Sequence, residues 1–254
     1  TTSSRVPEAM RAPRDIVLLL SDVHAQYDII DLQVAHAEES LDRPVGQVLV
    51  LGDFGLFGPD LHDHFRRARR RFSRPVAFIE GNHEDFRAFD QLVRDYADVF
   101  THLERGTVHA FGAWRWLCIG GARYMDSWST PSGCEIAAAD IAACLAHPPG
   151  SVDVVISHDC PSGIGVDNSP DFAHLGPPGV TGLARVAAQL RPRWWFFGHH
   201  HRWHDHEADG TRFVGLPESW QGYVVIAGDE PPRLVRHEVT RRRRPWWWRL
   251  IGLP

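Results

Sequence analysis

Five short apolar runs in this chain end in residues that a buried strand would not normally carry. Asp, Asn or His follows each run within one to three residues, in the segments LLLSDVH, LGDFGLFG, FIEGNHE, VVISHDC and WWFFGHHH. A carboxylate at the end of a buried strand must find a partner or a cation, because a desolvated charge is costly. The pattern therefore predicts a polar site at the point where several strands end.

Strand-like and helix-like segments alternate along the chain, which predicts an α/β fold with its ligands at the carboxyl ends of the strands. We expect strands near residues 15–20, 47–52, 75–80, 114–120, 152–157, 193–198, 211–215 and 221–226. We expect helices near residues 26–39, 60–72, 85–97, 134–146 and 180–190. The last third of the chain is rich in strands, which favours a second sheet packed against the first.

The helix expected over residues 60–72 carries an apolar stripe. Leu61, Phe65, Ala68 and Phe72 recur at helical spacing, so that one face is apolar and the arginines fill the others. The segment RRARRRFSR could follow a nucleic-acid backbone, but the stripe favours a solvated helix face instead.

The length of 254 residues suits one large domain or two small ones. No internal repeat or linker divides the chain, and we expect a flexible N-terminus over 1–14, one domain over 15–240 and a basic, Trp-rich tail over 241–254. Sixteen histidines are many for this length and favour metal binding.

The cysteines and the apolar segments indicate a cytoplasmic protein. The four cysteines are scattered without a CxxC pair, as expected of reduced thiols. The N-terminus has no apolar stretch typical of a signal peptide, and no apolar run approaches the roughly 20 residues of a membrane span.

The tail RRRRPWWWRL combines four arginines with three tryptophans. Trp favours membrane interfaces and Arg favours anionic lipid, so the tail could bind an anionic membrane surface peripherally. It could instead fold back on the core, form an oligomer contact or stack on single-stranded nucleic acid. The sequence leaves these alternatives open.

The residues at the strand ends supply oxygen and nitrogen ligands without thiolates. The candidate metal ligands are Asp22, His24, Asp53, Asn82, His158, His199 and His201. Such a set suits Mn²⁺, with Fe²⁺ or Zn²⁺ as alternatives. Seven ligands are too many for one ion with an open site and suit two ions that share a carboxylate. Residues i and i+2 of a strand point the same way, so Asp22 with His24, and His199 with His201, could each face one place.

The order of these segments resembles the five motif blocks of the calcineurin-like metallophosphoesterase superfamily, over residues 14–226. The blocks are D-x-H, GD-x-x-x-x-G, GNH-D/E, a lone His and GH-x-H, and each follows a strand-like run here. The resemblance implies a four-layer αββα sandwich of two mixed β-sheets flanked by helices. It also implies a metal-dependent phosphoric ester hydrolase with a dinuclear metal centre.

Carried over residue by residue, the resemblance implies two ligand sets. Asp22, His24, Asp53 and His201 would hold one ion, and Asp53, Asn82, His158 and His199 would hold the other. Asp53 would bridge the ions, which explains a carboxylate at the end of a buried strand. His83 matches the catalytic histidine that assists the leaving group, and Glu84 would support the site. The implied reaction is in-line attack on phosphorus by a metal-bound hydroxide.

A narrower resemblance points to the substrate. SHDCPSGI and LRPRWWFFGHHHRW are similar to segments of RNA lariat debranching enzymes, although these often carry Cys where this chain has Asp22. We therefore expect a phosphodiesterase that acts on a nucleotide or a nucleic acid. The alternatives are a phosphomonoesterase, a lipid-linked pyrophosphate hydrolase at the membrane surface, and a non-catalytic metal-binding scaffold.

Two segments near the ligands remain. His200 lies between two ligand candidates, so we expect it to point the opposite way and to bind no metal. The long irregular segment 161–179 lies between two ligand blocks, and its residues Asp167, Asn168 and His174 could contact the substrate.

Overall fold

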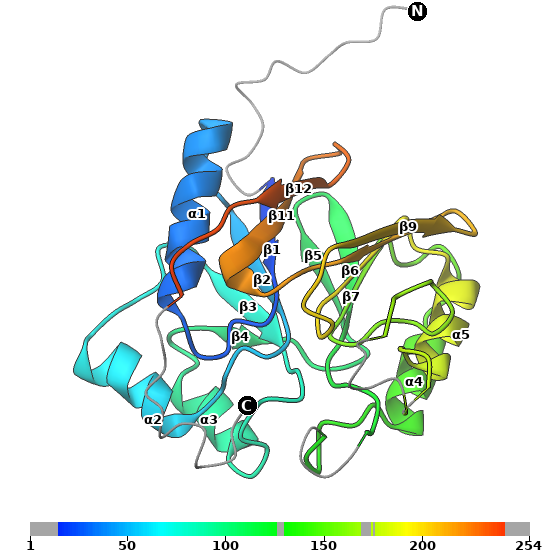
Figure 1. Cartoon of the computed structure of the whole chain (residues 1–254), viewed down its shortest axis with the longest axis horizontal. Coiled ribbons are helices and arrows are strands. Elements are labelled where there is room, and N and C mark those ends of the chain that lie inside the picture. Colours follow the sequence, from blue (N-terminus) through cyan, green and yellow to red (C-terminus); the bar gives the residue numbers. More distant parts are fainter. Residues whose placement is uncertain (1–14, 126–129, 169–173, 175, 242–254) are drawn as a thin grey trace, which may run out of the picture.

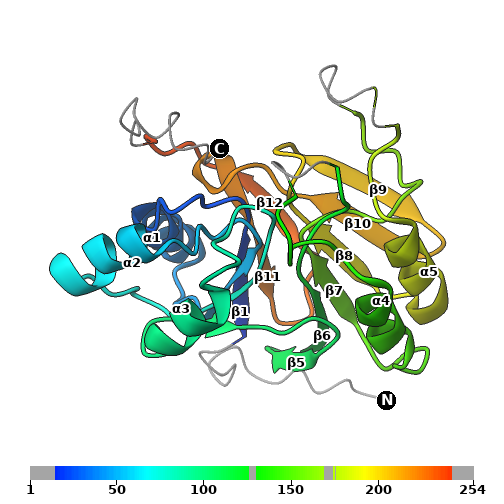
Figure 2. The same cartoon turned by 90° about the horizontal axis from the view of Figure 1, so that it is seen from below.

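Two six-stranded sheets face each other with helices on their outer sides, as Figures 1 and 2 show. The computed structural model describes residues 15–125, 130–168, 174 and 176–241. The first sheet has the order β12-β11-β1-β2-β3-β4, and the second has the order β5-β6-β7-β8-β10-β9. The predicted α/β sandwich of two mixed sheets flanked by helices is confirmed.

The elements follow one another in the expected alternation. The strands are β1 Ile16–Leu20, β2 Gln47–Leu51, β3 Val76–Ile79, β4 Thr101–His102, β5 Val108–Phe111, β6 Trp114–Ile119, β7 Val154–Ser157, β8 Trp194–Phe197, β9 His204–Ala208, β10 Thr211–Gly215, β11 Gly222–Ala227 and β12 Arg233–Arg236. The helices are α1 Asp28–Leu41, α2 Gly58–Leu61, the π-helix η2 His62–Arg67, α3 Phe89–Asp95, α4 Ala138–Leu145, α5 Thr181–Leu190 and the short 3₁₀ helix η4 Ser219–Gln221.

Parallel strands form the centre of both sheets. In the first sheet β1, β2, β3 and β4 are parallel, and β11 and β12 extend it in antiparallel fashion. In the second sheet β6, β7, β8 and β10 are parallel, with β5 and β9 as antiparallel edges. The carboxyl ends of parallel strands lie at one edge of a sheet, so each sheet brings several strand ends together.

The apolar residues separate into three core layers, because alternate residues of a strand face opposite sides of the sheet. In β1, Ile16, Leu18 and Leu20 pack under α1, whereas Val17 and Leu19 pack between the sheets. In β8, the pattern is the same: Trp194 and Phe196 face the first sheet, and Trp195 and Phe197 face α4 and α5. Strands that are apolar on both faces are therefore buried on both faces.

The helix predicted over residues 60–72 ends earlier than its apolar stripe indicated. A single turn, α2, continues as the π-helix η2 to Arg67, and Arg69 then adopts a left-handed conformation (φ 54°). Arg71 turns back and donates to the carbonyl oxygen of Phe65 (3.0 Å), which satisfies a free acceptor at the helix end. Tertiary contacts therefore decide the helix end over the spacing of its apolar residues.

The arginines of this segment lie on the surface among acidic partners. Arg66 and Arg71 contact Asp98, and Arg70 contacts Asp28. These ion pairs agree with the interpretation of the segment as a solvated face.

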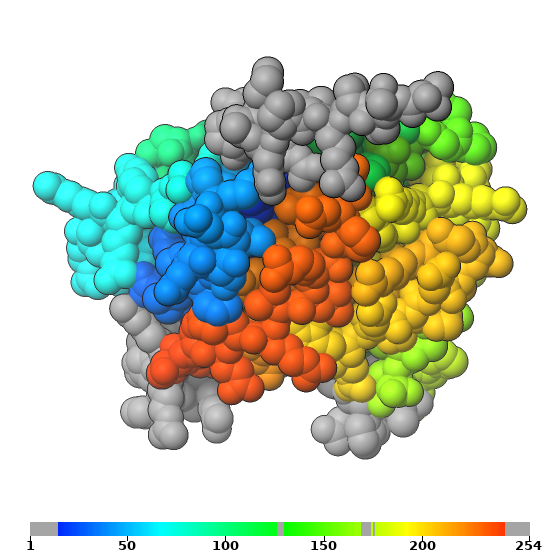
Figure 3. Space-filling view, turned by 90° about the horizontal axis from the view of Figure 1, so that it is seen from above, coloured from blue at the N-terminus to red at the C-terminus, as the bar shows by residue number. Residues whose placement is uncertain are grey.

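The C-terminal part of the described chain completes the first sheet. Figure 3 shows the segment from β11 onward, orange to red, between α1 (blue) and the β9–β10 hairpin (yellow). The tail predicted over 241–254 lies outside the described residues, apart from Arg241, as does the N-terminus 1–14. Among the described residues, no helix has the length and apolarity needed to cross a bilayer. The four cysteines are buried and form no disulfide.

Candidate metal centre

All seven predicted ligand residues lie where parallel strands of the two sheets end. Asp22 and His24 follow β1, Asp53 follows β2, Asn82 follows β3, His158 follows β7, and His199 and His201 follow β8. Two sheets that pack face to face present these strand ends to each other. The arrangement brings together residues that lie up to 179 positions apart, such as Asp22 and His201.

Left-handed turns, rather than extended strands, orient most of these side chains. The strands end at Leu20 and Phe197, so these residues do not alternate as in a strand. Asp22 and His24 nevertheless face one place, as expected. The non-glycine residues of the site with positive φ are Asp22, His24, Asp53, His199 and His201, at 54°, 49°, 49°, 66° and 51°. Each such residue costs of the order of 1–2 kcal/mol, and outliers of this kind gather at functional sites.

Asp22 is buried, and three residues contact its carboxylate. Ser21 Oγ donates to its Oδ2 (2.5 Å), the backbone N–H of His199 also donates to Oδ2 (3.2 Å), and His201 Nε2 lies 3.1 Å from Oδ1. Burial raises the pKa of Asp22, but the neighbouring His201 outweighs this effect and brings it to about 2. Burial lowers the pKa of His201, but Asp22 outweighs it and raises the value to about 9.

Asp53 lies at the centre of the cluster with 1% of its surface exposed. The backbone N–H groups of Asn82 and His83 donate to its Oδ1 (2.8 and 2.9 Å). Three imidazole Nε2 atoms surround the carboxylate, from His158 at 3.3 Å, His83 at 3.8 Å and His24 at 3.9 Å. Burial opposes ionisation, yet these imidazoles hold the pKa of Asp53 well below its usual range. No arginine of the described chain pairs with it.

The donor set fits divalent cations, because acceptor atoms face one another. His158 Nδ1 donates to the carbonyl oxygen of Leu51 (2.8 Å), so the neutral form of this imidazole presents the lone pair of Nε2 to the site. Nε2 lies 3.0 Å from Asn82 Oδ1 and 3.3 Å from Asp53 Oδ1. In that form, three acceptors converge and would be stabilised by a cation between them.

A second group of ligand atoms also includes Asp53, whose Oδ2 lies 3.9 Å from His24 Nε2. Asp22, His24, Asp53 and His201 each offer one atom, and these atoms all lie within 4.8 Å of one another. Burial lowers the pKa of His24, and it lowers that of His199 to about 3, so both imidazoles are neutral at neutral pH. A neutral imidazole is the form that binds a metal, so His201, whose pKa is raised to about 9, would release its proton when an ion binds.

Glu84 fixes the loop that carries Asp53. Its carboxylate accepts the backbone N–H groups of Phe54, Gly55 and Leu56 at 2.9, 3.0 and 2.5 Å. Burial and the nearby Asp53 raise the pKa of Glu84 to about 8, and the three N–H donors oppose that rise. The supporting role expected for Glu84 agrees with these contacts.

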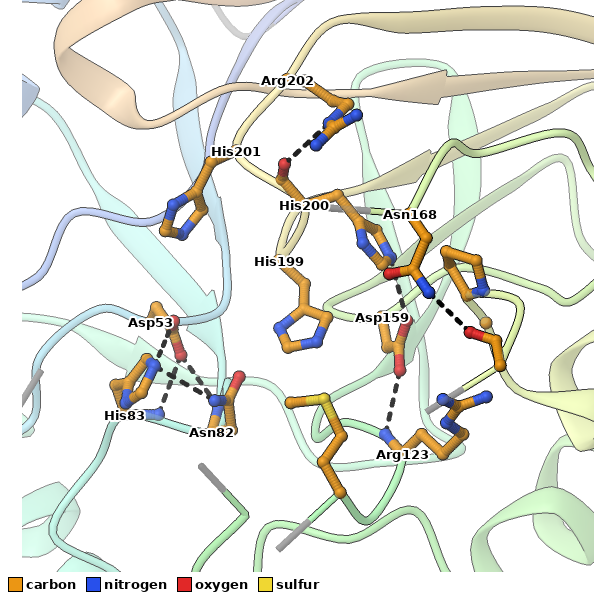
Figure 4. A pocket seen from close by; sticks show the side chains of 14 residues that line it. Asp53, Asn82, His83, Arg123, Asp159, Asn168, His199, His200, His201 and Arg202 are labelled. Atoms are coloured by element: carbon orange, nitrogen blue, oxygen red, sulfur yellow. Dashed lines mark hydrogen bonds and ion pairs between the residues drawn. The ribbon is translucent and has the colours of Figure 1, made fainter. Parts of the chain in front are cut away.

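A cavity of about 370 Å³ opens beside the ligand cluster, as Figure 4 shows. Asp53, Asn82 and His83 line one side of it, and Arg123 and Asp159 line the other. His199, His200, His201, Arg202 and Asn168 also line it. His83 is thus a wall of this cavity, and its Nε2 lies 3.1 Å from Asn82 Nδ2.

The structure adds residues to the site that sequence reasoning missed. Arg123 follows β6, whose carboxyl end lies at the same edge, so a sixth strand end was the available signal. Asp159 directly follows the ligand candidate His158 and contacts His200 (Nε2 to Oδ1, 3.2 Å). His200 therefore turns to Asp159, away from the carboxylates of Asp22 and Asp53. Asp167 and His174 are not among the described residues that line the cavity.

The model of one protein family matches most of this chain. The description of the family is "Calcineurin-like phosphoesterase", and the match covers residues 16–203. The chain belongs to this family. Like its members, this calcineurin-like phosphoesterase is a metal-dependent phosphoester hydrolase. The matched region includes all seven candidate ligands and ends before β9.

Solved structures share the fold of this phosphoesterase at low sequence identity. TT1561 of Thermus thermophilus has a TM-score of 0.57 and 13% identity, over 87% of this chain and 98% of its own. Phosphopantetheinyl hydrolase (PptH) from Mycobacterium tuberculosis has a TM-score of 0.54 and 16% identity, over 88% and 97%. No curated protein matches the chain. The similarity to lariat debranching enzymes remains a prediction from the sequence.

Proposed function

We propose that the protein hydrolyses a phosphodiester, with a nucleotide or a nucleic acid as substrate, at a centre of two divalent metal ions. The observation that carries the proposal is the convergence of acceptor atoms on Asp53 from two directions. His158 Nε2 and Asn82 Oδ1 approach its Oδ1, and the group of His24 and His201 lies around it as well. A carboxylate shared by two acceptor groups favours two cations over one.

The residues divide naturally between two ions. One ion would be held by Asp22, His24, Asp53 and His201, and the other by Asp53, Asn82, His158 and His199. Oxygen and nitrogen donors without thiolate suit Mn²⁺, with Fe²⁺ or Zn²⁺ as alternatives. When bound, two such ions supply a water molecule of lowered pKa and stabilise charge on the phosphoryl oxygens.

The chain's own residues favour a diester over a monoester. The cavity of about 370 Å³ beside Asp53 gives room for a substituent that a monoester lacks. His83 lines that cavity, and its Nε2 lies 3.8 Å from Asp53 Oδ2. From this position the protonated imidazole would donate to the leaving oxygen of an ester that is bound at the ligands.

Hydrolysis of two nitrophenyl esters by the Mn²⁺-loaded protein tests the proposal. We expect bis(4-nitrophenyl) phosphate to be hydrolysed with a higher kcat/KM than 4-nitrophenyl phosphate, with two metal ions per chain by elemental analysis. Hydrolysis of the monoester alone would contradict the proposal and favour the phosphomonoesterase alternative. Two bound ions without hydrolysis of either ester would contradict it as well.

The variant His83→Ala tests the role of that imidazole. We expect kcat for the diester to fall by about 10²–10⁴-fold, as is typical when a positioned proton donor is lost. The metal content should stay at two ions per chain, because His83 is outside both proposed ligand sets. His206→Ala, which removes an exposed histidine of the β9–β10 hairpin, is the matched control. Unchanged turnover in His83→Ala would exclude the role.

A further inference from the structure

The turn after β8 carries an imidazole that neither proposed ion uses. His199 and His201 in this turn are proposed ligands, and His200 lies between them. Both ligand residues have a left-handed backbone, with φ of 66° and 51°. A non-glycine residue in that conformation persists only where surrounding contacts fix it. The contacts that hold this turn therefore decide where the two ligand imidazoles lie.

Asp22 holds the two ligand residues of the turn in different ways. Its Oδ1 lies 3.1 Å from Nε2 of His201, so it fixes the side chain of that residue directly. From His199 it accepts the backbone N–H, at Oδ2 (3.2 Å). The orientation of the His199 imidazole therefore depends on other contacts.

Two neighbouring imidazoles contact the ring of His199. The ring centroids of His158 and His200 each lie 5.0 Å from its own, in edge-on geometry at 62° and 72°. His158 is itself held by the carbonyl oxygen of Leu51, to which its Nδ1 donates (2.8 Å). A comparable support for His200 would fix the ring of His199 from both neighbours.

Asp159 supplies that support. Its side chain is 3% exposed, and its Oδ1 lies 3.2 Å from Nε2 of His200, as Figure 4 shows. An ionised carboxylate only accepts hydrogen bonds, so Nε2 is the donor. The backbone N–H groups of Cys160 and Arg123 donate to Oδ1 (2.7 Å) and Oδ2 (2.9 Å) and hold the carboxylate in turn. The ring of His200 is thus fixed to a carboxylate that has little freedom to move.

We propose that His200 and Asp159 are positioning residues, which hold the imidazole of His199 in the orientation that binds an ion. Asp159 fixes the ring of His200, and that ring packs against the ring of His199. Partners behind metal ligands typically change metal affinity by about 10–100-fold. This proposal rests on the function proposed above, in which His199 is a ligand of one of two ions.

An alternative use of these residues is a separate ion site. Asp159, Cys160 and His200 each offer one atom, and these atoms lie within 4.8 Å of one another. The contacts of Asp159 favour the positioning role, because N–H donors already face both of its oxygens. The number of bound ions distinguishes the two roles.

Calorimetric titration of the metal-free protein with Mn²⁺ tests the proposal. In His200→Ala we expect the Kd of one ion to rise by about tenfold, because the ring that supports His199 is gone. The Kd of the other ion should stay close to that of the unmodified protein, because Asp22 still holds His201. His200→Gln should restore tight binding of both ions, since its amide can reach the same carboxylate and donate to it. Equal affinities in His200→Ala and the unmodified protein overturn the proposal.

A double-mutant comparison tests whether Asp159 acts through His200. Asp159→Ala should weaken the same ion as His200→Ala, and the double variant should bind it no more weakly than either single variant. Effects that add would mean that Asp159 acts independently of His200, and would overturn the proposed route.

Thermal unfolding of the metal-free variants shows which of them are folded. If Asp159→Ala unfolds, the comparison of Ala with Gln at position 200 decides alone. A lower melting temperature of His200→Ala with both affinities unchanged would indicate a purely structural role and overturn the proposal. The control His206→Ala removes an exposed imidazole from β9 and should leave both affinities unchanged.

Elemental analysis and the ester assay separate this proposal from the function on which it rests. Three ions in the unmodified protein and two in His200→Ala would make His200 a ligand and overturn the positioning role. If two ions bind but neither ester is hydrolysed, the proposed function fails, and the affinities of the His200 variants still decide the positioning role. Absence of Mn²⁺ binding to the unmodified protein overturns both.

Discussion

Asp53 is the residue on which both proposed ion sites depend. In Asp53→Asn the amide oxygen can still accept the backbone N–H groups of Asn82 and His83, whereas the charge between the imidazoles is lost. We expect the metal content to fall from two ions to at most one per chain. Hydrolysis of the diester should fall by more than about 100-fold, since even partners behind metal ligands typically change affinity or activity by about 10–100-fold.

Elemental analysis and steady-state kinetics on the same preparation check this expectation. Asp205→Asn is the matched control, because it changes an exposed aspartate that pairs with Arg212 on the β9–β10 hairpin. If Asp53→Asn keeps two ions per chain, Asp53 does not bridge them.

The sequence predicts the identity of the clustered residues better than their local geometry. A polar residue that follows an apolar run can be recognised in the sequence, so Asp53 and His158 could be predicted as site residues without a structure. The contacts of Glu84 with three backbone N–H groups could not be predicted. Any residue can supply a backbone N–H group, so the loop sequence does not indicate that a carboxylate binds it. Arg123 was missed for a similar reason, since its importance comes from a cavity that two sheets form together.

At the scale of elements, the backbone conformation of the turn after β2 determines the position of a site residue. Gly52 has φ +87°, and a Cβ atom there would lie 2.2 Å from His158 Nδ1. Gly52→Ala should therefore displace His158, which donates to the carbonyl oxygen of Leu51. We expect the free energy of unfolding to fall by more than the roughly 1–2 kcal/mol of the left-handed conformation alone. The affinity for Mn²⁺ should fall too.

Gly210→Ala separates the cost of the left-handed conformation from the cost of displacing His158. Gly210 has φ +80° in the turn between β9 and β10, and a Cβ atom there would meet nothing within 4 Å. Urea unfolding should show only the conformational cost for this variant, with Mn²⁺ binding unchanged in calorimetry. Equal losses of stability in the two variants would show that the approach to His158 does not matter.

The elements themselves were predictable where burial decides them. Strands such as β1 and β8 are apolar on both faces, and their positions agree with the expected ranges within one or two residues. The end of η2 was not predictable, because Arg71 contacts both the nearby carbonyl oxygen of Phe65 and the carboxylate of Asp98, which lies 27 positions along the chain. The strands β4, β5, β9 and β12 were also missed, since β4 has two residues and the others alternate or lack strong burial.

At the scale of the molecule, the site forms because contacts between the two sheets fix the position of one sheet relative to the other. Glu80 follows β3 in the first sheet, and Arg105 lies on the segment that crosses from β4 to the second sheet. Arg105 Nε donates to Glu80 Oε1 (2.5 Å), and its Nη1 donates to Asp140 of α4 (2.9 Å). One buried guanidinium therefore links the end of β3 to a helix on the far side of the second sheet.

This link predicts a dependence of stability on pH. Burial raises the pKa of Glu80, but the hydrogen bond from His102 and the charge of Arg105 outweigh this and lower it from 4.5 to about 2. A carboxyl group whose pKa is lower in the folded state stabilises the fold above its unfolded pKa and loses that contribution as the pH falls. The ion pair should thus contribute fully above about pH 5 and progressively less between about 4.5 and 2.

Urea unfolding of Glu80→Gln at several pH values measures this contribution. At pH 7 we expect the variant to lose roughly 1.5–3 kcal/mol of unfolding free energy, because the charged hydrogen bond between Glu80 and Arg105 is lost while Asp140 still pairs with Arg105. The difference from the unmodified protein should shrink as the pH falls from 5 toward 3, because Glu80 takes up a proton in the unfolded state below about pH 4.5 while it stays ionised in the folded state. Glu39→Gln, an exposed change on α1, should make no comparable difference. A difference for Glu80→Gln that stays constant between pH 7 and pH 3 would mean that its charge does not hold the two sheets together, and the convergence on Asp53 would need another support.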